Sequence, residues 1–305
     1  MTHGKYKKNN HPLMKEKIVS HIEKLVSEFI KKKWRVKSFK NLDDFASHPC
    51  AILSDDDYSV FVKLSTAPNA KVQFECEVDN LNVIRELSEV KTPLTIGVST
   101  FDSCSIMVLE AVKEVERKSR HWRDIGRTLA KLHQIKSDYF GFKRHSYFGP
   151  LYLDNRPLED WTTFYAERRI LPFLKIAVDS GNLPKRMISK VEKLAARLPK
   201  LCGPEVEPSL LHGDAQQNNY ISTEEETFFI DTSVYFGHPE LDLALIDYFQ
   251  PVPDEVFQGY HEIRSIEPGF EERKDLWRIF AWLGCVAVGG KSYINHLNNS
   301  LQKYL

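Results

Sequence analysis

The stretch from Leu210 to Tyr248, LLHGDAQQNNYISTEEETFFIDTSVYFGHPELDLALIDY, decides the fold. Its runs of apolar and polar residues predict a strand end, a polar turn, a hairpin, a second polar turn and a helix. The pattern H-G-D-x-x-x-x-N places an acid at Asp214 and an amide at Asn219, and a second acid, Asp231, follows an apolar run. This order of groups is typical of phosphoryl transfer, in which the protein positions the reactants and stabilises charge.

Each polar residue of this stretch has a candidate role. We expect Asp214 to accept a proton from an attacking hydroxyl group, as a catalytic base. Asn219 and Asp231 present oxygen atoms, which Mg²⁺ prefers as ligands. His212 is expected to shape the loop rather than to transfer protons. Asp242 opens an apolar helix, where it serves either as an N-terminal cap or as a brace for the catalytic loop.

The composition limits the classes of protein to which the chain can belong. With 305 residues and 42% hydrophobic residues, it is long enough for two lobes, each with a core. The 42 basic residues balance the 42 acidic residues, which argues against a nucleic acid or an anionic membrane as partner. The five cysteines are scattered without a C-x-x-C pair, and no apolar run has the length of a membrane span. We therefore expect a soluble, cytoplasmic protein.

The first lobe is predicted to cover residues 12–110, after a disordered tail at residues 1–11. A helix over residues 13–33 precedes several short strands, and a second helix covers residues 70–90. Lys63 ends the apolar strand Val60-Phe61-Val62, where a lysine can reach phosphate groups. Glu77 on the following helix is the candidate partner of Lys63, with Glu75 as the competing choice. Glu110 and Ala111 lie where the backbone of an inter-lobe hinge would hold an adenine.

The second lobe, residues 111–305, is predicted to be mostly helical. Apolar residues recur at helical spacing over residues 123–135, 161–178, 184–198, 241–249, 254–264 and 272–297, whereas residues 137–160 read as loop. The first lobe combines an antiparallel sheet with a helix. The predicted class is therefore an α+β, two-lobed, protein-kinase-like fold.

At this point the sequence resembles the aminoglycoside phosphotransferase superfamily and, more closely, the fructosamine (ketosamine) kinase family. The motifs that carry the closer resemblance are W-x-x-F-Y-x-E-R-R from Trp161 and F-G-H-x-E-x-D-L-A from Phe236. The resemblance implies an ATP- and Mg²⁺-dependent kinase with Asp214 as base, Asn219 and Asp231 as metal ligands, and Lys63 with Glu77 at the phosphates. Its acceptor would be a sugar hydroxyl of a ketoamine, free or on glycated protein, and we expect a monomer or a homodimer.

Two segments depart from the family pattern. Fructosamine kinases typically read H-G-D-L-W-x-G-N in the catalytic loop, whereas this chain reads HGDAQQNN. Gln216 and Gln217 are therefore candidate substrate contacts, together with Trp161 and His238 from the two family motifs. The phosphate-covering loop is normally rich in glycine, but residues 43–53, DDFASHPCAIL, contain none.

Three hypotheses about function remain open from the sequence. The first is an active ketosamine or small-molecule kinase, because Lys63, Asp214, Asn219 and Asp231 are all present. The second is a kinase of aminoglycoside-type antibiotics, motivated by the altered catalytic loop. The third is a pseudokinase that serves as a scaffold, motivated by the absence of glycine from the phosphate loop.

Overall fold

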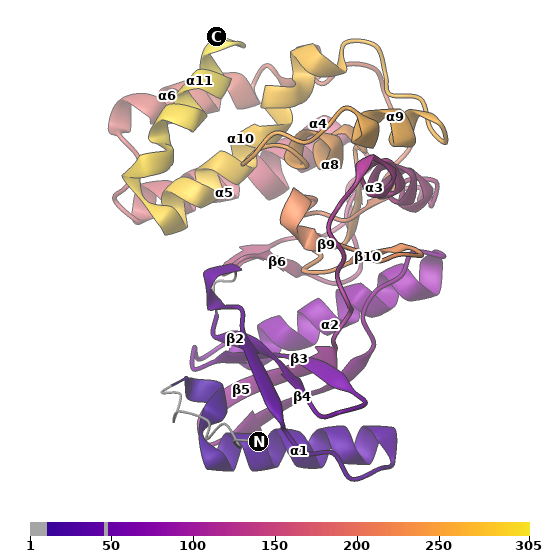
Figure 1. Cartoon of the computed structure of the whole chain (residues 1–305). Helices are drawn as coiled ribbons and strands as arrows, with labels where there is room; N and C mark the ends of the chain where they lie inside the picture. The colour runs from indigo at the N-terminus through magenta and orange to yellow at the C-terminus, as the bar shows by residue number, and fades with distance from the viewer. Residues whose placement is uncertain (1–10, 46–47) are drawn as a thin grey trace. The chain divides into compact units, whose positions relative to one another are not determined.

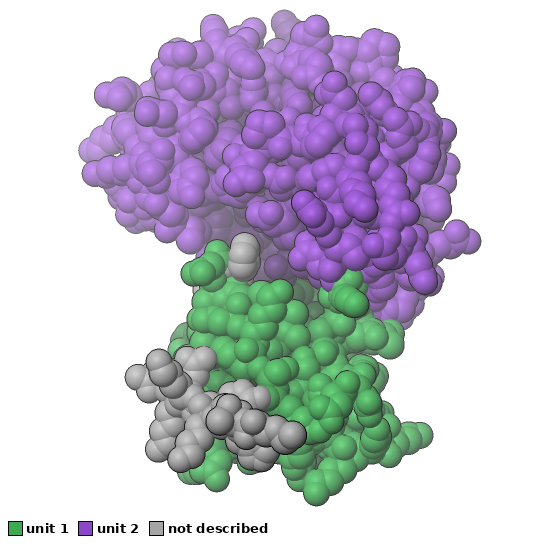
Figure 2. Space-filling view, in the orientation of Figure 1, with its two compact units in different colours: residues 1–78, 93–113 green, residues 79–92, 114–305 purple. Residues whose placement is uncertain are grey.

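The computed structural model describes residues 11–45 and 48–305 and divides the chain into two compact units. Unit 1 comprises Met1–Val78 and Pro93–Lys113, and unit 2 comprises Asp79–Thr92 and Glu114–Leu305; Figure 2 shows them in green and purple. Residues 79–92 lie in unit 2 by this division, and residues 111–113 lie in unit 1. The division at Lys113 lies close to the lobe boundary expected after residue 110.

Unit 1 is built on a five-stranded antiparallel sheet with the strand order β1-β2-β3-β5-β4 (Figure 1). Its central strand is the β-branched, aromatic segment that begins at Ser59, and its residues Val60 and Val62 are fully buried. The strands are β1 (Ser38–Asn41), β2 (Cys50–Ser54), β3 (Ser59–Ser65), β4 (Thr95–Phe101) and β5 (Cys104–Glu110).

Helix α1 (Glu16–Ile30) follows a 3-10 turn, η1 (Pro12–Met14), and packs against β4. Ile18, Ile22 and Val26 recur at helical spacing and are buried in the core of unit 1. The helix ends at Lys31, whose φ of 54° is left-handed. The structure therefore confirms the amphipathic helix that the spacing predicts. The helix begins later and ends earlier in the sequence than the predicted range 13–33.

The predicted tail needs one correction, at His11. Residues 1–10 of the tail lie outside the described residues. His11 is buried, and its Nε2 atom lies 2.9 and 3.0 Å from the two carboxylate oxygens of Asp43, in the 3-10 turn η2 (Asp43–Phe45). His11, which we expected in the tail, is thus held in the fold by its contact with the partly exposed Asp43.

Helix α2 (Ala70–Leu87) belongs to both units, since the division falls after Val78. Unit 2 is otherwise mostly helical, as predicted, and its longest helix, α10, packs on α5, α8 and α11 around one buried apolar core. The helices are α3 (Ser119–Leu132), α4 (Trp161–Tyr165), a π-helical segment η3 (Ala166–Ile170), α5 (Leu171–Asp179), α6 (Lys185–Ala195), α7 (Leu198–Leu201), α8 (Glu240–Leu245), α9 (Glu255–His261), α10 (Phe270–Gly289) and α11 (Ile294–Gln302).

Three short antiparallel strand pairs complete unit 2. Two of them carry the stretch from Leu210 to Tyr248, and the third lies in the segment 137–160 that we predicted to be loop. The pairs are β8 (Ser209–Leu211) with β11 (Tyr235–Gly237), β9 (Tyr220–Ser222) with β10 (Thr227–Phe229), and β6 (Ser146–Phe148) with β7 (Leu151–Leu153).

The last predicted helix, residues 272–297, is two helices in the structure. Gly290 has φ 82° and ψ −160°, a conformation that only glycine adopts readily, and it ends α10 before the 3-10 turn η5 (Lys291–Tyr293) leads into α11. Within the described part of the chain, none of the helices combines the length and apolarity that a membrane span requires.

Candidate active site

The strand pair β8–β11 places the loop that contains Asp214. Leu211 lies opposite Tyr235, so His212 and Gly213 leave the sheet beside the segment that follows Asp231. Asp242 in α8 holds both residues, because its carboxylate oxygens accept hydrogen bonds from the backbone nitrogens of His212 (2.7 Å) and Gly213 (3.0 Å). Asp242 is fully buried and thus braces the loop through its backbone.

His212 supports the same loop from inside. Its side chain is fully buried against Tyr220 and Phe229, and its Nδ1 atom accepts the backbone N–H of Asp214 at 3.3 Å. Burial lowers the pKa of His212, which keeps the imidazole neutral. A neutral ring that bonds to the backbone fits the expected shaping role.

Asp214 carries the carboxylate on which the site is centred. Its Oδ2 atom accepts a hydrogen bond from Nε2 of Gln216 at 3.5 Å, whereas its buried Oδ1 atom has no hydrogen-bond partner within the described residues. Burial first, and then the charge of Asp231, raises the pKa of Asp214 to about 7. An orphaned carboxylate oxygen at this position can accept the proton of a hydroxyl group.

Asn219 and Asp231 come together through the backbone. Asn219 ends the 3-10 turn η4 (Gln217–Asn219), is buried, and donates from Nδ2 to the carbonyl oxygen of Asp214 at 2.8 Å. The backbone nitrogen of Ile230 donates to the carbonyl oxygen of Asn219 at 3.0 Å, which brings the residue before Asp231 beside the turn. Asp231 is exposed and has φ 50°, a strained backbone conformation of the kind found at functional sites.

These residues fit a Mg²⁺ ion by the chemistry of their donors. After burial, the negative charge of Asp231 is the next cause that raises the pKa of Asp214, and a divalent cation would offset this repulsion. Among residues 11–45 and 48–305, no group of three or more His, Cys, Asp or Glu side chains could hold a metal ion. Mg²⁺ does not require one, because it binds through one or two protein ligands together with phosphate oxygens and water.

In unit 1, Lys63 and Glu77 form the ion pair that the sequence predicts. The Nζ atom of Lys63 lies 2.9 Å from both carboxylate oxygens of Glu77, and Lys63 is only 7% exposed. Lys63 is held in β3 between Cys50 of β2 and Met107 of β5. The competing candidate, Glu75, instead lies 3.5 Å from the exposed Lys71 on the same helix. The geometry therefore favours Glu77.

The expected hinge residues end strand β5. The backbone N–H of Glu110 donates to the carbonyl oxygen of Leu94 at 2.8 Å, and that of Ala111 donates to the carbonyl oxygen of Ser59 at 3.1 Å. Both amides are therefore used within unit 1. A nucleotide base at this segment would be read by other backbone groups than these two N–H groups.

The four expected substrate contacts lie in two different environments. Gln216 contacts the Asp214 carboxylate, and Gln217 donates from Nε2 to Oε1 of Gln250 at 3.0 Å. Trp161 and His238 are 6% and 1% exposed and lie 6.0 Å apart by ring centroid, in a buried aromatic cluster with Trp277. Of the four side chains, only that of Gln216 contacts the Asp214 carboxylate.

Sequence reasoning missed two residues that support the site. Asn80, which is 5% exposed in α2, donates from Nδ2 to the carbonyl oxygen of Thr232 (2.8 Å) and to Oγ of Ser146 (3.0 Å). Arg117, in the charged segment before α3, donates to backbone carbonyls on either side of Asn219. Neither residue stands in a motif. A polar residue on the apolar side of a predicted helix was the one available signal for Asn80.

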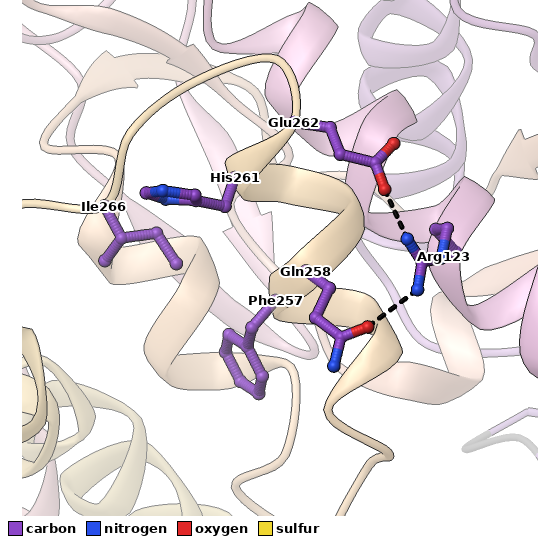
Figure 3. A pocket seen from close by; sticks show the side chains of 6 residues that line it. All are labelled: Arg123, Phe257, Gln258, His261, Glu262 and Ile266. Carbon is purple, nitrogen blue, oxygen red and sulfur yellow. Dashed lines mark hydrogen bonds and ion pairs between the residues drawn. The ribbon is translucent and has the colours of Figure 1, made fainter.

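A separate depression of about 570 Å³ lies on unit 2 between α3 and α9 (Figure 3). Arg123 on its rim donates to Glu262 (2.5 Å) and Gln258 (2.7 Å), so its charge is already compensated. None of the predicted site residues lines it. This depression is therefore separate from the candidate site residues of unit 2.

The sheet unit with its lysine–glutamate pair and the helical unit with its Asp–Asn–Asp group define a phosphotransferase of the protein-kinase-like fold. The sequence pattern of the fructosamine kinase family matches residues 18–305, and the chain belongs to this family. A Vibrio cholerae protein named "probable ketoamine kinase" is 30% identical over 259 residues, which cover 84% of this chain and 88% of that protein. The chain is thus an enzyme, a kinase, as predicted.

Solved structures agree on the fold. A protein from Thermobifida fusca that is classed as a fructosamine-3-kinase has a TM-score of 0.82 and 27% identity, with 93% of this chain and 98% of that chain covered. The aminoglycoside phosphotransferase APH(4)-Ia, in a ternary complex with AMP-PNP and hygromycin B, has a TM-score of 0.61 over 93% of this chain and 99% of that chain, at 14% identity. These likenesses confirm the predicted two-part α+β, kinase-like fold.

Proposed function

We propose that this chain transfers a phosphoryl group from ATP to a sugar hydroxyl of a ketoamine, the adduct of a sugar and an amine. The observation that carries the proposal is the Asp214 carboxylate, whose Oδ1 atom is buried without a partner among the described residues while its loop is braced by Asp242. The names of related proteins support the acceptor class, since the Vibrio relative and the mouse relative are named as ketoamine and ketosamine kinases.

Asp214 is the proposed catalytic base. The hydroxyl oxygen of the acceptor attacks the terminal phosphorus, its proton passes to Oδ1 of Asp214, and ADP leaves with the electron pair of the broken P–O bond. The partner of Oδ2, Gln216, and the backbone bond to His212 hold the carboxyl group in place. A positioned base of this kind contributes roughly 10²- to 10⁴-fold to a rate.

The remaining residues hold the nucleotide. Lys63, oriented by Glu77, contacts phosphate oxygens as a rigidly held point charge. Asn219 and Asp231 would hold Mg²⁺, which would neutralise charge on the phosphate groups when bound. The backbone around Glu110 and Ala111 receives the adenine, through groups other than their own N–H groups.

Gln216 is the proposed determinant of acceptor specificity, because it is the one candidate contact that reaches the Asp214 carboxylate. Gln217 is anchored to Gln250, and Trp161 and His238 are assigned to core packing. Within the described residues, no disulfide joins any two of the five cysteines. This fits action in the reducing cytoplasm on a free or protein-bound glycated amine, as a monomer or a homodimer.

A coupled assay of ADP release tests the function directly. Fructosyl-amines, ribulosyl-amines and aminoglycosides are compared as acceptors, with wild-type protein and Asp214→Asn. We expect turnover with a ketoamine, and a loss of at least about 10²-fold in kcat in the variant. Turnover with an aminoglycoside alone would redirect the assignment to antibiotics. No turnover, together with no thermal shift from ATP and Mg²⁺ at millimolar concentration, would contradict the kinase and favour the scaffold.

A further inference from the structure

The backbone on both sides of Asn219 is held by one side chain from outside the loop. Arg117 donates from Nη1 to the carbonyl oxygen of Gln217 at 3.0 Å and from Nη2 to the carbonyl oxygen of Tyr220. These carbonyls belong to the second residue before Asn219 and to the residue directly after it. The guanidinium group therefore bridges the turn that presents the Asn219 amide.

The guanidinium group is itself fixed. Its central carbon lies 4.8 Å from the ring centroid of Trp122 in α3, and burial lowers the pKa of Arg117. The segment that carries Arg117 is bonded to the neighbouring strand, since the backbone nitrogen of Val115 donates to the carbonyl oxygen of Ser222 at 2.9 Å. The ring of Trp122 and the backbone bond to Ser222 in β9 thus define the position of Arg117.

We propose that Arg117 is a positioning residue that orients Asn219 for the metal ion that accompanies the nucleotide. This inference rests on the proposed function, in which Asn219 and Asp231 hold Mg²⁺. The Asn219 side chain is directed by its bond to the Asp214 carbonyl, but its backbone depends on the turn that Arg117 bridges. Loss of the bridge frees two carbonyls and lets the turn rotate, which moves the ligand oxygen away from Asp231.

The two hydrogen bonds of the bridge require the planar guanidinium group of an arginine. Two nitrogen atoms of one guanidinium group reach two carbonyls at once, whereas the single nitrogen of a lysine reaches one of them. Arg117→Lys therefore keeps the charge and part of the bridge. Arg117→Met keeps an apolar stem of similar length against Trp122 and removes the bridge entirely. The two variants separate the hydrogen bonds from the packing.

The test is the affinity for Mn²⁺ in the presence of saturating AMP-PNP, measured as the loss of the electron paramagnetic resonance signal of free Mn²⁺. We expect Arg117→Met to bind Mn²⁺ roughly 10- to 100-fold more weakly than wild type, as for other residues that orient metal ligands, and Arg117→Lys to be intermediate. The matched control is Arg120→Met, which removes an exposed arginine paired with Glu224. It should leave Mn²⁺ affinity unchanged.

The outcomes separate this inference from the proposed function. Wild-type Mn²⁺ affinity in Arg117→Met, whatever its melting temperature, overturns the positioning role. If that variant does not fold, wild-type affinity in folded Arg117→Lys overturns it instead. Wild-type protein that binds Mn²⁺ with nucleotide but phosphorylates no ketoamine contradicts the proposed function alone. A wild-type protein that binds no Mn²⁺ with nucleotide contradicts both.

Discussion

A β-carbon on Gly213 would lie 2.0 Å from the carbonyl oxygen of Ser233, closer than real β-carbons approach any backbone atom. Gly213 also has φ 81°, so the turn before Asp214 requires glycine for two reasons. Ser233 is fixed there because its backbone nitrogen donates to the carbonyl oxygen of His212 at 2.8 Å. The loop that contains Asp214 and the segment after Asp231 are thus packed backbone against backbone.

Gly213→Ala should therefore lose both activity and stability. Gly181→Ala is the matched control, because Gly181 has φ 73° but open space where a β-carbon would lie. The control measures the strain of a left-handed alanine, about 1–2 kcal/mol. In urea unfolding, we expect the Gly213 variant to have a clearly lower free energy of unfolding than the Gly181 variant. We also expect the Gly213 variant to lose most of its kcat. Equal free energies of unfolding in the two variants would show that the loop can move aside.

Asp242→Asn should weaken the brace on the catalytic loop. The carboxylate also lies 3.1 Å from Nε2 of His133, so the amide cannot serve all three partners equally. Hydrogen bonds to a buried charged group contribute about 1.5–3 kcal/mol each, and we expect a loss of at least about 2 kcal/mol in the free energy of unfolding. Asp254→Asn, at an exposed position before α9, is the control. Urea unfolding and kcat report stability and loop order separately.

The pairing of Lys63 predicts different effects for two neighbouring glutamates. Glu77→Gln removes the partner of a 7%-exposed lysine and should raise the KM for ATP by about tenfold or more, since the lysine loses its orientation. Glu75→Gln breaks only an exposed pair with Lys71 and should leave ATP kinetics within about twofold of wild type. Steady-state kinetics at varied ATP concentrations give the KM of each variant. Similar KM values for the two variants would contradict the assignment of Glu77.

Stability should fall in acid partly because of His238. Burial, and next the charge of Arg273, lowers the pKa of His238 to about 3, whereas an unfolded histidine titrates near 6.5. Between these two values the unfolded chain binds a proton that the folded chain does not, so stability is lost as the pH falls below 6.5. Relative to His238→Gln, wild type should lose roughly 1.4 kcal/mol per pH unit between pH 6 and pH 4.5.

The measurement for His238 is urea unfolding of the two proteins at several pH values. The control is His261→Gln, which replaces an exposed histidine in α9. Asp214 acts in the opposite direction, because its pKa is raised to about 7 and its contribution to stability is lost as the pH rises from about 4 to 7. Comparison with the His238 variant removes this contribution, which is common to both proteins. Parallel pH curves for wild type and His238→Gln would contradict the prediction.

Much of the local structure follows from the sequence alone. The spacing of Ile18, Ile22 and Val26 predicts α1, and the apolar strand that ends at Lys63 predicts β3. Both signals are periodic and short in range, so neighbouring residues carry them. Gly289 and Gly290 interrupt the pattern of the helix predicted at 272–297, and the structure divides the helix there. The hairpin β6–β7 was missed, because it depends on packing.

The candidate site residues also divide into those that a local pattern predicts and those that only tertiary contacts identify. The identities and the order of Asp214, Asn219 and Asp231 are a local pattern, so the sequence by itself predicted a phosphoryl-transfer site and identified the family. Only the tertiary structure decided that Glu77 rather than Glu75 contacts Lys63, and that Asp242 and Arg117 hold the backbone of residues 212–220. These contacts join residues that are 14 to 103 positions apart, and no local periodicity records which hydrogen bonds such residues make.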